Sequence, residues 1–580
     1  MCRSLTTFAA LILTTFAAAS IGNTSLCAPI TGTNCNQNDL ADGGVAPSAA
    51  ACCALCIART DCFAWTWNRR RDQHCWLKKN CDGKVDDATC VSGYGARPAT
   101  PAPPPPLPPA PAVPTTFQRG VSLGGWLVME GWMFDQFKTP AENDFVRANR
   151  EAGGDAFAIA AQVKHWEGYI PDDALDAMRA LGITHVRIPI GYWIVEAPVS
   201  GVRGDRGGDG GAATTMRDVG FQHEGYVTGG IVHLEALLAK LKARGMRALI
   251  DAHAMPGGSS RCASYAGMQV AEPHFWRGAV GDAIVPCAGA GPYTSTRAAA
   301  AATNSRGATT WMEVGVDAVH KVAQWVVGLE RNASLAGVVS GLEVVNEPGL
   351  GFSGLLPEIK AYHAAIVPAA QRVFREASVG VNVTVNFIGP NDEGIAQWLR
   401  DQIDAHVFDG RSLVVDFHNY YNWDSAVHTF DDARARVCGT ASGTQADWKQ
   451  YAAAQLSTLI GEWSNAIDLN SHATSDIDDP AQQREMRSLW ADQVSLFESV
   501  PGGRTVGQYY WTIRQGSGWD PRPNATRAQL VDTAWNKSLT SFGTRNWNLG
   551  ELARVGVVKP IPDLAISGVC ACDGCTPSLT

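Results

Sequence analysis

The stretch of sequence that decides the fold is residues 230–253, GIVHLEALLAKLKARGMRALIDAH. Its first part, Gly230 to Arg244, is amphipathic at helical spacing, and its second part, Arg247 to His253, is a short apolar run that ends on ionisable residues. A helix that leads into a buried strand is the repeating unit of folds built on a parallel sheet. The same unit is therefore expected along the rest of this region.

Eight short β-branched runs alternate with helical stretches from about residue 115 onward, as expected for repeated βα units. Amphipathic segments such as Trp311 to Arg331 are long enough to cross from one strand to the next. Eight strands without a GxGxxG motif after the first predict an α/β fold of the (β/α)8 TIM barrel class, not a Rossmann sheet. The expected strands are Gly120 to Trp126, His185 to Gly191, Arg247 to His253, Val338 to Glu347, Thr384 to Gly389, Leu413 to Tyr420, Thr458 to Trp463 and Gln508 to Ile513.

The composition is that of a globular protein with more than one domain. The chain has 580 residues, of which 46% are hydrophobic and 18% are charged. A formal net charge of -9 gives no electrostatic reason to expect a nucleic acid or an anionic membrane as partner. A neutral polysaccharide is compatible with that balance.

The first 20 residues have the features of a secretory signal. Arg3 precedes the apolar run Leu5 to Ala19, which closes on small residues. The alternative, a membrane anchor, needs about 20 apolar residues, and this run is too short. We therefore expect residues 1–20 to be removed and the protein to be secreted and extracellular, with attachment to a cell wall as one option. Sequons that could carry N-glycans in an exported chain begin at Asn23, Asn332, Asn382, Asn524 and Asn536.

The cysteines are concentrated near the N-terminus. Nine of the 16 lie between Cys27 and Cys90, which in an exported chain indicates a disulfide framework. Zinc is the competing interpretation, but no pair of CxxC motifs at finger spacing is present. Without Cys2 the count is odd, so at least one thiol is free or pairs between chains.

A proline-rich stretch divides the chain. Ten of the 17 residues in 98–114 are proline, which predicts a polyproline II spacer. The expected order is a cystine-rich module at 21–97, this linker, a catalytic domain at 115–560 and a cysteine-containing tail at 561–580.

The N-terminal module resembles the PAN/apple domain. The segments that carry the resemblance are Cys52-Cys53-Ala54-Leu55-Cys56, Cys62-Phe63-Ala64-Trp65-Thr66-Trp67 and Cys75-Trp76-Leu77-Lys78. The resemblance implies binding of carbohydrate or protein without chemistry. Trp65, Trp67 and Trp76 are either a platform for stacking sugars or, as the residue type favours, buried core.

Two expected strands of the larger domain end on glutamate. One ends Val344-Val345-Asn346-Glu347-Pro348, and another ends Leu459-Ile460-Gly461-Glu462-Trp463. Reactive groups of TIM barrels lie at the carboxyl ends of strands. Each glutamate alone could be a solvated strand end or a structural ion pair. Together they match the acid and the nucleophilic carboxylate that hydrolysis of a glycosidic bond requires.

The larger domain resembles glycoside hydrolase family 5, and within it the exo-β-1,3-glucanases. The motifs recur in order between about Phe117 and Asn548. They are Arg119-Gly120-Val121-Ser122-Leu123-Gly124-Gly125-Trp126, Val186-Arg187-Ile188-Pro189-Ile190-Gly191-Tyr192-Trp193, Asn346-Glu347-Pro348 and Gly461-Glu462-Trp463-Ser464.

The resemblance implies roles for four residues that act at the reacting bond. It makes Glu347 the acid/base and Glu462 the nucleophile. Arg187 would brace Glu462 and keep it ionised by lowering its pKa. Asn346 would hydrogen-bond the 2-hydroxyl of the sugar.

Further residues would bind the sugars themselves. His253, His418 and Tyr420 would line the subsite of the reacting sugar. Glu130 would grip hydroxyls of a terminal glucose, and Trp511 would form a platform beneath it. Trp423 would clamp the next sugar. The opposite side of that clamp departs from the family pattern, because Cys262 stands where an aromatic residue is usual, which weakens the inference of linkage and exo mode.

The sequence therefore predicts a secreted retaining exo-β-1,3-glucanase that takes β-glucan as substrate and needs no cofactor and no metal. Through the PAN-like module it would bind a carbohydrate or protein of the cell wall, and neither nucleic acid nor membrane is expected as partner. Two alternatives stay open. One is an endo-acting enzyme on another β-glucan, and the other is a catalytically silent polysaccharide-binding protein.

Overall fold

The structure is a computed structural model in which two compact units, residues 1–108 and 109–580, are each considered by themselves. The predicted signal at 1–20, linker at 98–114 and tail at 561–580 lie outside the described residues. The described residues are 30–35, 39–57, 59, 62, 64–69, 73–79, 84–94, 117–134, 141–198, 215–222, 225–280, 282–288, 309–387, 394–439, 444–467, 477–499, 504–513 and 545–558.

The N-terminal unit is an antiparallel sheet with one helix. The strands are β1 (Ile30–Cys35), β2 (Asp39–Val45), β3 (Ala64–Asn68), β4 (His74–Lys78) and β5 (Lys84–Tyr94), in the order β1-β5-β3-β4-β2. Helix α1 (Ala49–Ile57) contacts β3 and β4.

Cystines form much of the core of this unit. Disulfides join Cys52 to Cys75 and Cys56 to Cys62, and these four residues pack with the buried ring of Trp65. Trp65 is therefore core, as the residue type favoured, whereas Trp67 and Trp76 are half-buried. The odd number of cysteines predicted at least one unpaired thiol. Among the described residues, Cys90 is such a free thiol, and it is buried.

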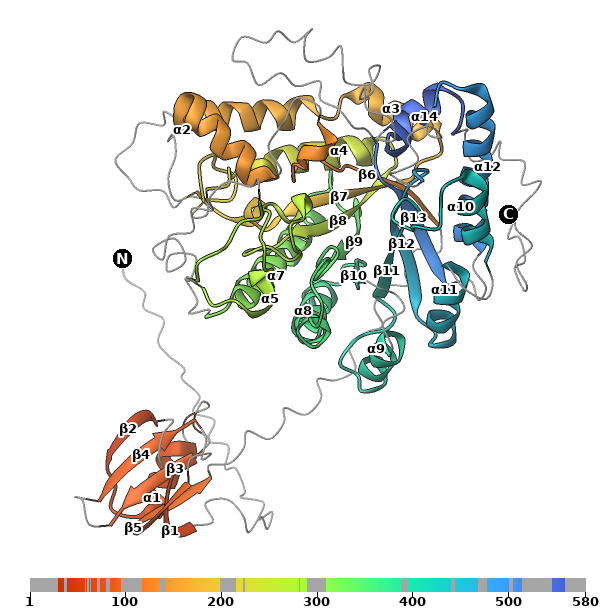
Figure 1. The fold of residues 1–580 in the computed structure, drawn as a ribbon. Coiled ribbons are helices and arrows are strands. Elements are labelled where there is room, and N and C mark those ends of the chain that lie inside the picture. Colours follow the sequence, from red (N-terminus) through yellow and green to blue (C-terminus); the bar gives the residue numbers. More distant parts are fainter. Residues whose placement is uncertain are drawn as a thin grey trace, which may run out of the picture. The chain divides into compact units, whose positions relative to one another are not determined.

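The larger unit is a closed barrel of eight parallel strands, so the predicted fold class is confirmed (Figure 1). In barrel order the strands are β10 (Asn382–Asn386), β11 (Leu413–Asn419), β12 (Ser457–Trp463), β13 (Thr505–Tyr510), β6 (Gln118–Ser122), β7 (His185–Gly191), β8 (Arg247–Ala254) and β9 (Val339–Glu343). Each overlaps one of the predicted strands. The difference that matters for the site is at β9, which ends at Glu343, so Glu347 lies in the loop beyond it.

Helices surround the ring of strands (Figure 1). The segment 230–253 shows how the sequence produces this layer. Helix α4 (Gly230–Ala243) buries Leu234, Leu238 and Leu241 on one face, and the chain then enters the buried strand β8. The other helices are α2 (Glu142–Gly168), α3 (Asp172–Ala180), α5 (His274–Arg277), α7 (Trp311–Glu330), α8 (Leu356–Glu376), α9 (Ile395–Asp404), α10 (Phe430–Cys438), α11 (Thr444–Ala453), α12 (Pro480–Ser499) and α14 (Leu549–Arg554).

The helices were compared with the length and hydropathy of membrane-spanning segments. Among the described residues, no helix has both the length and the apolar character needed to cross a membrane.

Two of the predicted glycosylation sites lie among the described residues. Asn332 is exposed, but Asn382 begins β10 and is only 6% exposed, so the prediction of an acceptor there is wrong. Asn23, Asn524 and Asn536 lie outside the described residues.

Candidate active site

Nine of the ten predicted site residues line one pocket of about 680 Å³. The tenth, Arg187, lies fully buried beneath it and contacts Glu462. The pocket is at the carboxyl ends of the strands, where the parallel arrangement brings residues distant in sequence together. The nine are Glu130, His253, Asn346, Glu347, His418, Tyr420, Trp423, Glu462 and Trp511.

Glu462, near the end of β12, is held from two sides. Arg187 Nη1 donates to Glu462 Oε1 at 2.7 Å, and the Tyr420 hydroxyl donates to Glu462 Oε2 at 2.7 Å. Gly461 allows this placement, because a Cβ at that position would lie 2.0 Å from an oxygen of Asp416. The carboxylate is thus fixed in orientation, with little freedom to move.

Arg187 organises the floor of the pocket. Besides Glu462, its guanidinium donates from Nη2 to Asn346 Oδ1 at 2.8 Å and from Nε to Glu343 Oε2 at 2.9 Å. It also lies 3.0 Å from Asp251 Oδ2. The fork geometry of an arginine suits such simultaneous contacts. Asn346 thereby keeps its Nδ2 unpartnered among the described residues and available to a ligand.

Glu347 follows β9 in a left-handed backbone conformation, with φ 36°. His418 Nδ1 lies 2.7 Å from Glu347 Oε1 and 3.4 Å from Glu462 Oε2. One ligand atom each from Glu347, His418 and Glu462 lies within 4.8 Å of the other two. A non-glycine residue in this conformation is strained, and such strain is concentrated at functional sites.

The pKa values of the two glutamates are shifted in opposite directions. Burial raises the pKa of Glu462, and the charge of Glu347 adds to this effect, although His418 and Arg187 act in the opposite direction. Arg187 thus acts on Glu462 in the predicted direction, but burial outweighs it and the net shift of the Glu462 pKa is upward. Burial also opposes ionisation of Glu347, but the hydrogen bond and charge of His418 outweigh it and lower the Glu347 pKa. His418 keeps its proton, since neighbouring carboxylates overcome burial and raise its pKa well above the usual range.

The inner, buried end of the pocket is formed by Glu130 and Trp511, and Trp132, which is 43% exposed, lies beside Glu130. Trp132 Nε1 donates to Glu130 Oε2 at 2.9 Å, and Glu130 Oε1 has no partner among the described residues. The Trp511 ring is stacked on His253 at 5.6 Å, and Gly124 leaves room for it, since a Cβ there would be 2.6 Å from the indole. Burial raises the pKa of Glu130 to about 7.

His253 turns its second nitrogen toward this inner space. Its Nδ1 pairs with Asp251 Oδ2 at 2.5 Å, whereas Nε2 has no partner among the described residues. His253 Nε2, Glu130 Oε1 and Asn346 Nδ2 are thus three buried polar atoms without a hydrogen-bond partner among the described residues. Unpaired buried polar atoms are costly, so a molecule rich in hydroxyl groups would satisfy them.

The outer wall differs from the prediction. Trp423 is 68% exposed at the rim. The family resemblance predicted Cys262 on the side of the clamp opposite Trp423. Cys262 forms a disulfide with Cys287, which joins two loops of the wall. It is therefore not a simple replacement of an aromatic ring. Tyr265, three residues on, lines the same pocket and meets the His253 ring edge to face at 5.6 Å.

Some residues in or beneath the pocket were not predicted. Asp251, Glu343 and Asp416 are buried on strands, and the available signal was an acidic residue within an apolar run. Trp132, Tyr265 and Trp547 come from loops and 3-10 turns, where no periodicity marks them.

Two groups of three side chains have geometry that could hold a metal ion, namely Glu343 with Asp416 and His418, and Glu347 with His418 and Glu462. Arg187 lies against Glu343 and Glu462, so a cation already occupies much of the space around both groups. The prediction that no metal is needed stays a prediction.

A family model described as PAN domain matches residues 33–78. A probable glucan 1,3-beta-glucosidase A from Aspergillus clavatus is 24% identical over 360 residues, 61% of this chain and 66% of the relative. The chain thus spans slightly less than two thirds of that protein. A glucan endo-1,6-beta-glucosidase B from Emericella nidulans is 23% identical over 411 residues, 68% of this chain and 82% of the relative.

Among solved structures, the rutinosidase from Aspergillus niger aligns with 77% of this chain and 99% of its own, at 15% identity and a TM-score of 0.45. A likeness of that size carries no argument about function. Taken together, the N-terminal module is a PAN domain, and the TIM barrel that follows it is distantly homologous to the fungal glucan 1,3-beta-glucosidases.

Proposed function

We propose that this protein is a secreted retaining β-glycoside hydrolase that releases glucose from β-1,3-glucan. The observation that carries the proposal is the placement of Glu347 and Glu462 in one pocket, with interacting carboxylate oxygens within 4.8 Å. Retaining enzymes hold their two carboxyl groups about 5 Å apart, whereas inverting enzymes leave room for a water molecule at roughly 6.5–9.5 Å.

In the first step Glu462 attacks the anomeric carbon, and the bond to the leaving oxygen breaks. Glu347 gives its proton to that oxygen, so the product is an ester of the sugar with Glu462 and a released alcohol. The Glu347 pKa is lowered and the pKa of His418, 2.7 Å away, is raised, so Glu347 is ionised and His418 is protonated before the reaction. His418 is therefore placed to supply the proton that Glu347 delivers.

In the second step a water molecule attacks the same carbon and Glu347 accepts its proton. Glu462 leaves as a carboxylate, and the configuration of the sugar is retained. Arg187 and Tyr420 hold the two oxygens of Glu462, so they stabilise the carboxylate that returns. Asn346 Nδ2 is free to bind the sugar 2-hydroxyl, a contact that strengthens in the transition state.

Release of a terminal glucose is supported by the inner end of the pocket. Glu130 and His253 present unpartnered atoms there, and Trp511 provides an aromatic face. These groups suit one pyranose with free hydroxyls. The relative from Aspergillus clavatus, whose name states a glucan 1,3-beta-glucosidase, supports the same linkage.

A second candidate is internal cleavage of another β-glucan. The relative from Emericella nidulans, which matches 68% of this chain, is named for endo-1,6 activity. The departure at Cys262 also favours a different outer subsite. A silent binding protein is the least supported alternative, because both glutamates and their hydrogen-bond partners are present.

Residues 1–20 and the PAN domain support a proposal about where the protein acts and what it binds there. We place the protein outside the cell because of the apolar run after Arg3, and we assign to the PAN domain a wall carbohydrate or protein as partner. Removing the PAN domain should leave rates on soluble oligosaccharide unchanged and reduce attachment to insoluble glucan.

The nucleophile is tested with Glu462→Gly. This variant should lose nearly all turnover, and sodium azide should restore it with an α-glycosyl azide as product. Glu498→Gly on α12, which pairs with Arg119 away from the pocket, is the matched control. Substantial activity of Glu462→Gly without azide would show that another group is the nucleophile.

The linkage that is cleaved, and whether cleavage is at the chain end or internal, are tested by product analysis on β-1,3- and β-1,6-linked oligosaccharides. Glucose in the first minutes from the β-1,3 series supports the main proposal. Early oligosaccharides from the β-1,6 series would support the second candidate, and no product from either would leave binding as the function.

A further inference from the structure

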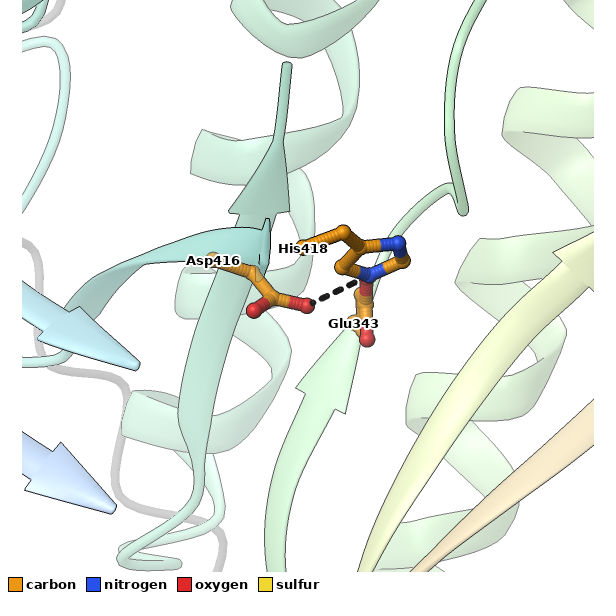
Figure 2. Close-up of side chains that lie close together, drawn as sticks. All are labelled: Glu343, Asp416 and His418. Atoms are coloured by element: carbon orange, nitrogen blue, oxygen red, sulfur yellow. Dashed lines mark ion pairs between the residues drawn. The ribbon is translucent and has the colours of Figure 1, made fainter. Parts of the chain in front are cut away.

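Beneath the two glutamates, three buried polar atoms gather without hydrogen bonds of good geometry among the described residues. They are Glu343 Oε1, Asp416 Oδ2 and His418 Nε2. One ligand atom from each side chain lies within 4.8 Å of the other two. Figure 2 shows the three side chains close together, with the ion pair between Asp416 and His418, which spans 3.3 Å. Glu343 Oε1 is then the one atom of the three without a contact partner among the described residues, and leaving a buried polar atom unpaired is costly.

The charges around this point do not balance if every acid is ionised. Arg187 contacts three carboxyl groups directly, and His418 contacts two more. Buried charges are tolerated when they are paired, so a surplus carboxylate would take up a proton. The groups are the acids Asp251, Glu343, Glu347, Asp416 and Glu462 and the bases Arg187, His253 and His418.

Glu343 has one donor, Arg187, whereas Asp251, Asp416 and Glu462 have two or more each. Its Oε2 accepts from Arg187, and its Oε1 accepts nothing. Asp416, by contrast, accepts the Gly461 N–H at 2.5 Å and also faces His418. Donors favour the ionised form of a carboxyl group, so the surplus proton belongs on Glu343. Burial agrees with this choice, since it raises the Glu343 pKa well above the usual range despite Arg187.

We propose that Glu343 is a positioning residue that stays neutral, accepting a hydrogen bond from Arg187 and donating one to Asp416. The inference rests on the proposed function. Glu343 then fixes Arg187, which holds Glu462, and it leaves Asp416 ionised to hold His418 beside Glu347. A single buried proton thus orients the partners of both reacting glutamates.

The decisive pair of variants is Glu343→Gln and Glu343→Leu. A glutamine reproduces both hydrogen bonds, since its carbonyl can accept from Arg187 and its amide can donate to Asp416. We expect Glu343→Gln to keep kcat and the pH profile of kcat/KM, and Glu343→Leu to lose about 10- to 100-fold in kcat. If Glu343 were ionised, the glutamine would remove a charge and move the acid limb of the profile. That shift, or failure of Glu343→Gln to fold, would overturn the proposal.

Two measurements do not depend on turnover. Infrared difference spectra should show a protonated carboxyl band in the natural protein that Glu343→Gln lacks, and absence of that difference would refute the neutral acid. Elemental analysis of the purified full chain tests the competing occupant, a divalent cation, and a stoichiometric metal lost in Glu343→Leu would also refute it. A natural protein without glycosidase activity would contradict the proposed function, while the infrared result would still decide the state of Glu343.

Discussion

The inner and outer ends of the pocket are built by different means. Beneath the inner end, Arg187, Asp251 and Glu343 are completely buried and come from neighbouring strands of the barrel. At the outer end Trp423 is 68% exposed, and the facing loop is held by the disulfide between Cys262 and Cys287. The inner end is thus fixed by the fold and the outer end by local loops.

This difference separates chemistry from substrate choice. Strand register determines which side chains meet at the carboxyl edge of a barrel, so the reacting groups tolerate little change. Loops vary without cost to the barrel core, so they are where linkage and chain length are selected. Variants at the inner end should accordingly affect every substrate, and variants at the outer end only substrates with a second sugar.

The largest effect is expected from Arg187→Lys. A lysine presents one compact charge and cannot reproduce the contacts to Glu462, Glu343 and Asn346 together. Breaking a buried pair costs about 3–5 kcal/mol, so kcat/KM on an aryl β-glucoside should fall roughly a hundredfold or more.

Arg119→Lys is the matched control for that substitution. Arg119 also lies on a barrel strand and forms two hydrogen bonds of 2.8 Å, but to the half-exposed Glu498. It should change kcat/KM very little. Equal losses in both variants would mean that Arg187 stabilises the barrel without a specific role at Glu462.

A smaller effect is expected from Tyr420→Phe, which removes the hydroxyl that donates to Glu462 at 2.7 Å. A hydrogen bond to a charged group contributes about 1.5–3 kcal/mol, so kcat/KM should fall at least tenfold. The lost donor favoured the ionised carboxylate. The pKa of Glu462, already raised by burial, should therefore rise further, and the acid limb of the pH profile should move to higher pH.

Tyr509→Phe is the control, because Tyr509 is fully buried and its hydroxyl also donates a hydrogen bond of 2.7 Å, but to Gln118 outside the pocket. A lower rate in Tyr420→Phe with no movement of the acid limb would contradict this account of Glu462.

The sequence could predict the groups carried by barrel strands but not those that depend on loops or on burial. The eight strands and the residues that close them were found because periodicity and apolar runs mark strands, and parallel packing then brings their ends together. The disulfide of Cys262 was not found, since its partner is 25 residues away in a loop and pairing depends on three-dimensional approach. The pKa order of Glu347 and Glu462 was also missed, because it depends on burial and on His418.

Glu130→Gln should separate binding from stability at the inner end. Burial raises the Glu130 pKa from 4.5 to about 7, so the natural protein is stabilised by this group below pH 4.5 and loses that contribution as pH rises through 7. The glutamine has no such loss. The variant should therefore gain up to roughly 3 kcal/mol over the natural protein at pH 8 and nothing at pH 4.5.

The same variant should bind glucosides more weakly at pH 8, because an ionised carboxylate accepts hydrogen bonds from sugar hydroxyls more strongly than an amide does. Thermal unfolding and KM, each measured at pH 4.5 and 8, check both effects. A Tm difference that is independent of pH would show that Glu130 does not titrate in this range.

The smallest effect is expected from Trp423→Ala at the outer end. The ring is largely exposed at the rim of the pocket, so it can stack only on a sugar beyond the reacting one. A stacking contact is worth about 1 kcal/mol, which corresponds to a several-fold increase in KM for laminari-oligosaccharides. An aryl β-glucoside, which has no second sugar, should show almost no change in KM, and kcat should stay constant for both substrates. Val232→Ala, another exposed apolar position on the outside of α4, is the control for surface truncation. Equal changes in KM for both substrates would place Trp423 at the reacting sugar, and the division between a fixed inner end and a selective outer end would then have to be redrawn.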